Sequence, residues 1–269
     1  MSRLQSVFSD LKQVGQKALI PYITAGDPDL DVTLSLMLAL VDSGADIIEL
    51  GVPFSDPMAD GPTIQLAYER ALKHNVGLRD VLALVSRFRE QNSHTPVVLM
   101  GYMNPLEYMG YDAFVEAAKE SGVDGVLIVD LPPEECETLT ELLHRNELDT
   151  IFLLTPTTSD ARAREICRHS SGYVYYVSIK GVTGANTLDV EDVDRQVKRL
   201  RQATDLPIAV GFGIKTPADA AAVAQVADGV IVGSALVNII AQSQTGKAVE
   251  ISSQVSALLA DMRKGMDAG

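Results

Sequence analysis

The stretch GVLIVD occupies residues 125–130, and the stretch TIFLLT follows at residues 150–155. Both runs are apolar at odd and at even positions, so both faces of each strand need cover. Such strands are typical of a parallel sheet with helices on one face and a packed interior on the other. Longer segments of helical period follow each run, and this alternation predicts parallel strands joined by crossover helices.

The same unit recurs on both sides of these two runs. We expect eight strands, which are Ala18–Thr24, Asp46–Gly51, Val97–Tyr102, Gly125–Asp130, Thr150–Thr155, Tyr173–Ser178, Ile208–Gly213 and Gly229–Gly233. Eight evenly spaced units in roughly 250 residues favour closure into a single (β/α)₈ (TIM) barrel domain over residues 1–269, preceded by an extra amphipathic N-terminal helix. An open doubly wound sheet is the alternative, although no glycine-rich dinucleotide fingerprint follows the first strand.

The composition excludes several classes of protein. Lys and Arg number 22 and Asp and Glu number 36, giving a net charge of −14, which argues against a nucleic-acid partner. Two cysteines and four scattered histidines supply neither a disulfide framework nor metal-ligand spacing. The first residues lack the features of a signal peptide, and polar residues interrupt the apolar stretch 220–241. We expect a reduced, metal-free cytoplasmic protein without a membrane span.

Glu49 lies within the apolar run IIEL of the second predicted strand. An ionisable side chain is tolerated there only toward the barrel interior, near its mouth. Desolvation is expected to raise its pKa toward neutrality, which suits a group that both donates and accepts a proton. Since the neighbouring strand centres contain no Lys or Arg, we favour a catalytic Glu49 over a salt-bridged structural one.

Asp60 lies near the end of the loop PFSDPMADGP, residues 53–62, which three prolines stiffen. Two interpretations are open from the residues alone: Asp60 belongs to an active site, or it caps the helix that begins near Pro62. Asp56 on the same loop is either a solvated turn residue or a contact for a partner protein.

Three glycine-bearing loops follow the sixth, seventh and eighth predicted strands. They are Gly181–Asn186, Gly211–Gly213, and Gly233 with Ser234. Barrel enzymes bind phosphate at this place, because glycine lets the backbone approach an anion and amides at a helix N-terminus satisfy its oxygens. We therefore expect a phosphate site there.

Lys180, just beyond the sixth predicted strand, is the rival catalytic residue, because its amine could form a Schiff base with a carbonyl substrate. Aromatic residues at the strand ends either wall a planar ligand or fill the barrel interior. These residues are Tyr22, Tyr102, Tyr175 and Phe212.

The run IELGVPFSDPMADG at residues 48–61 closely resembles the signature of the tryptophan synthase α chain family. GVTGAN at 181–186, GFGI at 211–214 and VGSA at 232–235 occur at the family's later positions, and the likeness extends over essentially the whole chain. The resemblance implies a (β/α)₈ barrel that cleaves indole-3-glycerol phosphate to indole and glyceraldehyde 3-phosphate. It also implies that indole passes to a pyridoxal-phosphate β chain in an α₂β₂ tetramer, and that this chain needs no cofactor of its own.

The resemblance assigns roles to particular residues. Glu49 would protonate the indole ring carbon, and Asp60 would hold the ring N–H as positive charge develops. Tyr175 and Thr183 would line the site, and amides around Gly184, Gly213 and Ser234 would receive the phosphate. Tyr22 departs from the family, which often has Phe there, and Ser178–Lys180 departs from its usual Ser-Arg, which leaves the role of Lys180 open.

Two alternatives to this lyase are a Schiff-base aldolase that uses Lys180 and a barrel that serves mainly as a regulatory binding subunit. Proline-stiffened segments after the second, third and fourth predicted strands indicate where a β chain would dock, because docking costs them little ordering entropy. Similar segments meet the β chain in the family. The expected interface residues are Pro53, Asp56, Asn104 and Pro132.

Overall fold

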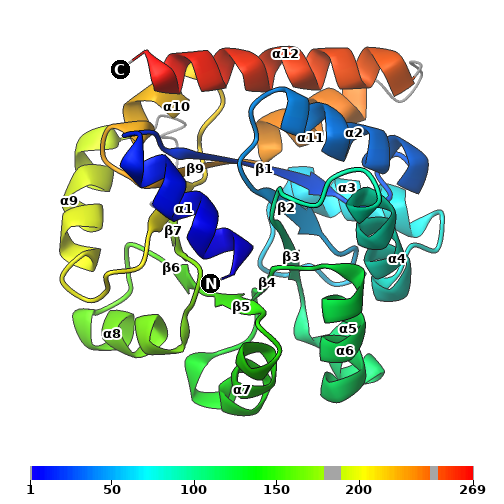
Figure 1. Cartoon of the computed structure of the whole chain (residues 1–269), viewed down its shortest axis with the longest axis horizontal. Coiled ribbons are helices and arrows are strands. Elements are labelled where there is room, and N and C mark those ends of the chain that lie inside the picture. Colours follow the sequence, from blue (N-terminus) through cyan, green and yellow to red (C-terminus); the bar gives the residue numbers. More distant parts are fainter. Residues whose placement is uncertain (1, 179–188, 243–247, 269) are drawn as a thin grey trace.

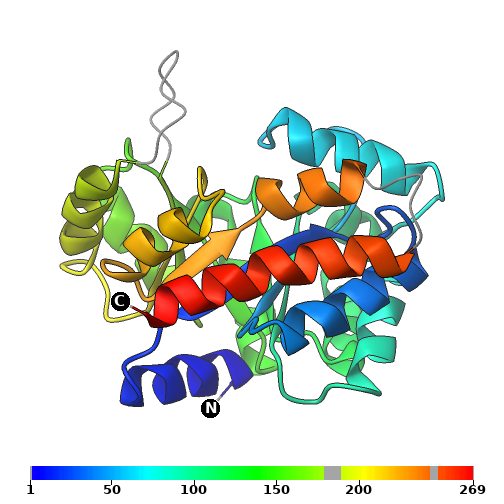
Figure 2. The ribbon, with the colours of Figure 1, turned by 90° about the horizontal axis from the view of Figure 1, so that it is seen from above.

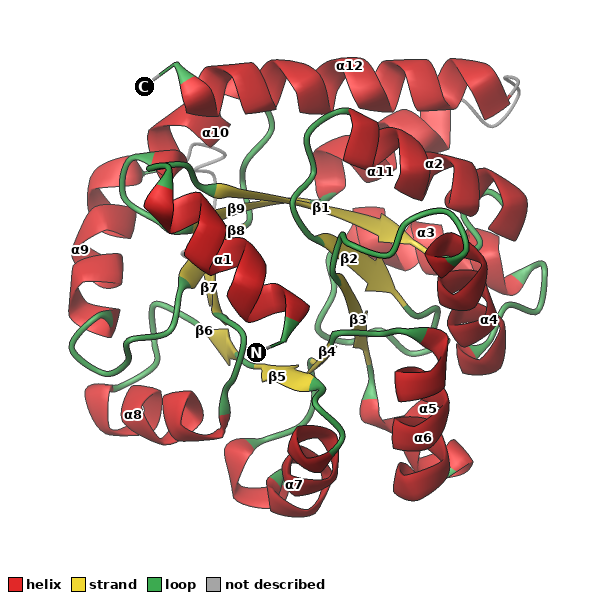
Figure 3. Ribbon diagram, in the orientation of Figure 1, coloured by secondary structure: helices red, strands yellow, loops and turns green. Residues whose placement is uncertain are grey.

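The strands of this chain form one parallel sheet that closes on itself (Figures 1 and 3). The structure is a computed structural model and describes residues 2–178, 189–242 and 248–268. The strands are β1 Ala18–Thr24, β2 Ile48–Gly51, β3 Val97–Gly101, β4 Gly125–Ile128, β5 Asp149–Ile151, β6 Leu153–Leu154, β7 Val174–Val177, β8 Ile208–Gly211 and β9 Gly229–Val232. Their order is β5-β4-β3-β2-β1-β9-β8-β7-β6. Because only Phe152 separates β5 from β6, the two ends of this order are one interrupted strand, and the sheet is a barrel.

Helices surround the barrel, as the alternating sequence pattern predicts (Figure 3). They are α1 Arg3–Gln13, α2 Leu30–Asp42, α3 Pro62–Leu72, α4 Leu78–Arg89, α5 Met103–Met109, α6 Tyr111–Ser121, α7 Glu137–Arg145, α8 Asp160–His169, α9 Val190–Leu200, α10 Pro217–Ala224, α11 Ser234–Gln242 and α12 Ala248–Asp267, with a short 3₁₀ helix at Pro133–Glu135. The predicted TIM barrel with an extra N-terminal helix is confirmed. None of the helices in the described ranges is long and apolar enough to cross a membrane.

The first predicted strand matches β1 at both ends, and most of the others are correct in place but too long. The second begins at Ile48 instead of Asp46, and six others lose one or two residues at an end. The predicted fifth strand, 150–155, is divided at Phe152 into β5 and β6. Apolar residues continue past the strand ends into the loops, so composition overestimates strand length.

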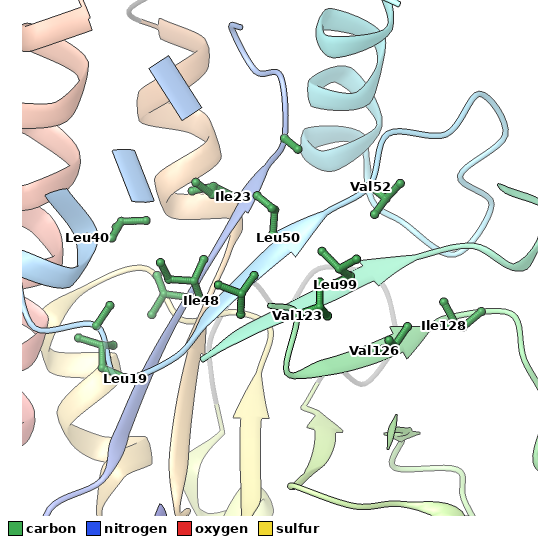
Figure 4. Close-up of a cluster of buried hydrophobic side chains, with 14 of the residues drawn as sticks. Leu19, Ile23, Leu40, Ile48, Leu50, Val52, Leu99, Val123, Val126 and Ile128 are labelled. Atoms are coloured by element: carbon green, nitrogen blue, oxygen red, sulfur yellow. The ribbon is translucent and has the colours of Figure 1, made fainter. Parts of the chain in front are cut away.

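Period-two alternation divides each strand between two environments. Residues such as Ile48, Leu50 and Leu99 point outward and pack in the large cluster between strands and helices (Figure 4). Residues one position away, including Ile47 and Val98, belong to a second cluster inside the barrel. In β2 the same alternation turns the side chain of Glu49 inward between two outward-facing apolar neighbours.

Helix α1 lies across the N-terminal end of the barrel, opposite the end that carries α3 (Figures 1 and 2). Ser2 caps the helix through the backbone N–H of Gln5. Leu4 and Phe8 are the buried residues of α1, and both pack into the cluster inside the barrel. The helix therefore forms the floor of the barrel, and the strand C-termini form its open face.

Candidate active site

Glu49 is fully buried in β2, at the register position where β1 presents Tyr22. Its Oε1 atom accepts a 2.6 Å hydrogen bond from the Tyr173 hydroxyl, and its Oε2 atom is buried without a hydrogen-bond partner among the described residues. No cation pairs with it within the described ranges, so the salt-bridged alternative does not fit. Burial raises the pKa of Glu49 to about 7, against the opposing effect of the Tyr173 hydrogen bond.

The loop between β2 and α3 positions Asp60. Gly61 occupies the N-cap position of α3, so the alternative interpretation of Asp60 as the helix cap is wrong. The Oδ2 atom of Asp60 instead accepts a 2.7 Å hydrogen bond from the hydroxyl of Tyr102, the residue that follows β3. Burial raises the pKa of Asp60, and the Tyr102 hydrogen bond partly offsets that rise.

Tyr102 holds more than the carboxylate of Asp60. Its hydroxyl also accepts a 3.0 Å hydrogen bond from the backbone N–H of Ala59, and its ring stacks on Phe54 with centroids 5.1 Å apart. One aromatic side chain thus ties the two ends of the β2–α3 loop to β3. Tyr102 does not merely fill space.

Tyr22 and Tyr175 line the same interior as the two carboxylates. Burial is the main cause that raises the pKa of each hydroxyl, and the charges of Glu49 and Asp60 both add to it. Since both carboxylates act on both tyrosines, the four side chains share one region. The Tyr22 ring lies against Gly51, where an added Cβ would be 2.1 Å from its hydroxyl oxygen. Tyr175 lies against Gly211 in the same way, at 2.3 Å.

The end of β8 has an uncommon backbone. Phe212 has φ +80° and Gly213 has φ +79°, a conformation that L side chains adopt at a cost. A Cβ on Gly213 would meet nothing within 4 Å, so this backbone borders open space. Phe212 is 45% exposed, so it lies at the edge of the site and does not form a closed wall around a ligand.

Gly233 and Ser234 stand at the N-terminus of α11, directly after β9. The backbone N–H groups of Leu236 and Val237 bond to the carbonyl of Gly233, so the N–H groups that precede them have no intrahelical acceptor. Together with Gly213 this gives two of the three predicted phosphate segments. The third, with Thr183 and Gly184, and the rival residue Lys180 lie outside the described residues.

The residues expected at a partner interface differ in exposure. Asp56 and Asn104 are exposed, and Pro132 is half-buried. Pro53 is buried, so the prediction that it is a surface contact is wrong for the isolated chain. Asn104 lies in α5, the helix that follows β3.

Sequence reasoning missed two tyrosines of this site. Tyr173 holds Glu49, and Tyr68 on α3 accepts a 3.2 Å hydrogen bond from the Tyr22 hydroxyl. Tyr173 stands two residues before Tyr175 in the sequence, so strand alternation places both on the inner face. No signal in the sequence pairs Tyr68 with Tyr22.

The described residues contain no group of three His, Cys, Asp or Glu side chains that could hold a metal ion.

Comparison with known proteins identifies the family to which this chain belongs. The model of the tryptophan synthase alpha chain family matches residues 8–267. The chain belongs to the tryptophan synthase α chain family. The tryptophan synthase alpha chain of Marinobacter nauticus is 58% identical over 267 residues, covering 99% of this chain and 98% of the relative. That of Thioalkalivibrio sulfidiphilus is also 58% identical, over 271 residues, covering 99% of this chain and all of the relative.

Solved structures agree with the sequence comparison. The crystal structure of tryptophan synthase subunit alpha from Legionella pneumophila superposes with a TM-score of 0.93 at 47% identity, covering both chains completely. A chain of tryptophan synthase from M. tuberculosis in its aminoacrylate-bound form gives 0.87 at 36% identity, covering 99% of this chain and all of that chain. The tryptophan synthase α chain is a lyase that cleaves indole-3-glycerol phosphate in tryptophan biosynthesis, and this is the activity of the present chain. It carries no cofactor, because pyridoxal phosphate belongs to the β chain.

Proposed function

We propose that Glu49 is the general acid and base of the cleavage and that Asp60 stabilises the cation formed on the indole ring. One observation carries the proposal: a fully buried carboxyl with a pKa of about 7 has one oxygen held by Tyr173 and the other unpartnered. At neutral pH such a group is present in both protonation states, as a residue that first gives and then takes a proton requires.

The proton balance follows from this assignment. The Glu49 carboxyl gives its proton to the ring carbon that carries the glycerol phosphate side chain, and the ring becomes a cation. Glu49, now a carboxylate, accepts the proton of the adjacent glycerol hydroxyl while that carbon becomes a carbonyl. The carbon–carbon bond breaks, and its electron pair returns to the ring. Indole and glyceraldehyde 3-phosphate are the products, and Glu49 regains its proton.

Asp60 contributes by differential binding. A carboxylate that accepts the ring N–H interacts more strongly with a cationic ring than with a neutral one, and only such a difference lowers the barrier. Its hydrogen bond from Tyr102 keeps Asp60 in place before the charge develops. Tyr22 and Tyr175 supply apolar walls for the planar ring.

Backbone amides around Gly213, Gly233 and Ser234, with Gly184 and Thr183 from the segment beyond the described residues, are proposed to bind the phosphate. The open space at Gly213 and the N–H groups at the start of α11, which have no intrahelical acceptor, support this assignment. Amide donors suit a chain whose net charge is −14, because they need no basic cluster.

A β chain is proposed to dock on the exposed loop that carries Asp56, together with Asn104 and Pro132, in an α₂β₂ tetramer. The exposure of Asp56 and Asn104 and the match to a chain of the M. tuberculosis tryptophan synthase support the proposal. Asp56 and Asp60 share one loop, so a partner that fixes Asp56 also positions Asp60.

The whole chain is proposed to act as one barrel domain in the cytoplasm, where the buried free thiols of Cys136 and Cys167 stay reduced.

The test is release of indole from indole-3-glycerol phosphate by the purified chain, with and without a β chain. The chain contains no Trp, so the fluorescence of indole has little protein background. Borohydride treatment during turnover separates the Schiff-base alternative, which predicts a covalent adduct and an inactive Lys180→Ala variant. We expect no adduct and only a modest loss in Lys180→Ala. An absence of turnover even with the β chain would instead indicate a purely regulatory subunit.

A further inference from the structure

Two contacts connect the barrel floor to the catalytic carboxyl. The ring of Phe8 on α1 packs against the ring of Tyr173, with centroids 5.7 Å apart and planes inclined by 50°. The hydroxyl of the same tyrosine donates its 2.6 Å hydrogen bond to Glu49. Phe8 is 7% exposed, and Tyr173 and Glu49 are fully buried. A side chain outside the strands therefore reaches Glu49 through one intermediate ring.

Two side-chain contacts anchor the start of helix α1 to the barrel. At its start, the Ser2 hydroxyl donates a 2.5 Å hydrogen bond to Asp149, the first residue of β5. The Arg3 guanidinium pairs at 2.7 Å with Asp124, a buried carboxylate just before β4. These bonds join the helix to the N-terminal end of the barrel strands, within two helical turns of Phe8.

The space beside Phe8 is not completely filled by protein. A cavity of about 140 Å³ lies there, lined by Phe8 and Leu11 of α1 and by residues at the barrel floor such as Arg201 and Pro207. Phe8 lines this cavity and Tyr173 does not. Removing the Phe8 ring would thus join its volume to an existing cavity and leave the Tyr173 ring free to turn into it.

We propose that Phe8 is a positioning residue for the lyase reaction: its ring holds Tyr173 so that the tyrosine hydroxyl stays on Oε1 of Glu49 and Oε2 stays available for proton transfer. This inference rests on the proposed role of Glu49. A hydrogen bond weakens steeply with distance and angle, so a modest rotation of Tyr173 is enough to lose it. Phe8 touches no reacting atom and acts only through Tyr173.

A double-mutant cycle on the full-length chain tests the inference. Phe8→Ala and Tyr173→Phe are each expected to lower kcat about tenfold with little change in KM, because a hydrogen bond to a charged group is lost. The double variant is expected to lose little more than either single one, since both changes remove the same bond. A loss of about 100-fold in the double variant, the product of the single effects, would overturn the proposal.

Matched variants distinguish a positioning role of the Phe8 ring from a general loss of packing between α1 and the barrel. Leu11→Ala shortens another apolar side chain on α1 that packs near the same cluster but carries no ring. It should leave kcat and its pH dependence unchanged. Phe8→Tyr keeps the ring and should retain nearly full activity. A matching loss of kcat in Leu11→Ala would contradict the specific role of Phe8.

The pH profile gives a second readout that a purely structural role would not move. Loss of the Tyr173 hydrogen bond raises the pKa of Glu49, because that bond favours the carboxylate. The limb of the kcat profile that belongs to Glu49 should therefore shift to higher pH in both Phe8→Ala and Tyr173→Phe. If Phe8→Ala does not fold, Phe8→Leu takes its place in the cycle. A profile that stays unmoved while kcat falls would contradict the proposal.

The failures of the two proposals are distinguishable. If Glu49→Gln retains turnover, the proposed function fails whatever Phe8 does. If Glu49→Gln is inactive but Phe8→Ala and Tyr173→Phe act independently, only the inference about Phe8 fails.

Discussion

The hydroxyl of Tyr102 donates a 2.7 Å hydrogen bond to Oδ2 of Asp60 across 42 residues of sequence. The hydroxyl oxygen of Tyr102 also accepts a hydrogen bond from the backbone N–H of Ala59, the residue before Asp60. One atom of β3's C-terminal loop therefore fixes both the carboxylate and the backbone that carries it. An electrostatic catalyst needs this, because a group already in place costs no reorganisation when charge develops on the substrate.

Tyr102→Phe is expected to lower kcat about tenfold while the chain stays folded, because a hydrogen bond to a carboxylate contributes about 1.5–3 kcal/mol and part of this is lost in the transition state. Indole release measures the effect. Tyr111→Phe is the matched control, since it removes a hydroxyl bonded to Glu107 on the outer helices. Equal loss in both variants would show that the effect is not specific to Asp60.

The sequence was enough to predict that Glu49 points into the barrel, because a charged side chain inside an apolar strand has only one direction in which to point. Alternation then places Tyr22 and Tyr175 with it, and the structure brings these three together. The partners that tune the carboxylates were not predictable in the same way. Tyr102 reaches Asp60 through a loop path that only the folded barrel determines, and a tyrosine such as Tyr173 is equally compatible with simple filling of the barrel.

The two interpretations of Asp60 show the same limit. A Pro-rich loop that leads into a helix makes an acidic cap plausible, and the choice depends on whether Asp60 or Gly61 adopts the N-cap position. That one-residue difference is within the uncertainty of helix boundaries from sequence. The structure settles the backbone position and the Tyr102 contact, and the catalytic role remains a proposal.

Gly213→Ala and Gly15→Ala form a matched pair for the phosphate site. Both glycines have φ between +70° and +80°, and a Cβ on either would meet nothing within 4 Å. Both variants should therefore lose about 1 kcal/mol of stability through backbone strain. Only Gly213→Ala is expected to raise KM for indole-3-glycerol phosphate, by about tenfold, because Gly15 lies at the barrel floor. Equal KM values in the two variants would place the phosphate elsewhere.

Asp56→Ala is expected to reduce stimulation by a β chain and to leave the slow activity of the isolated chain nearly unchanged. Asp56 is exposed, and its side chain accepts a hydrogen bond from the hydroxyl of the neighbouring Ser55. Asp10→Ala removes an exposed carboxylate at the opposite end of the barrel and serves as the control. Indole release with and without the β chain measures both variants. A parallel loss in the two assays would mean that Asp56 supports the loop and transmits nothing.

The raised pKa of Glu49 makes stability depend on pH. Its value rises from 4.5 to about 7 on folding, so the unfolded chain releases this proton first as the pH increases. The contribution of Glu49 to the stability of the folded state is therefore least favourable above pH 7, and the full difference corresponds to about 3 kcal/mol. Glu49→Gln should equal the wild type in free energy of unfolding near pH 4 and exceed it by up to about 3 kcal/mol near pH 8.5. Urea titrations at the two pH values measure the free energy of unfolding. If Glu49→Gln gained as much stability at pH 4 as at pH 8.5, the raised pKa of Glu49 would not be the cause.

The kcat of Glu49→Gln for indole release, measured beside the affinity for an unreactive indole-alkyl phosphate, tests the central claim most directly. The amide keeps the size of the side chain but cannot exchange a proton. The account predicts that kcat falls by at least about 100-fold, the lower bound for loss of a general acid–base group, while the affinity changes by less than about threefold. Turnover within about tenfold of the wild type would contradict the account, because the proton would then reach the ring by another route.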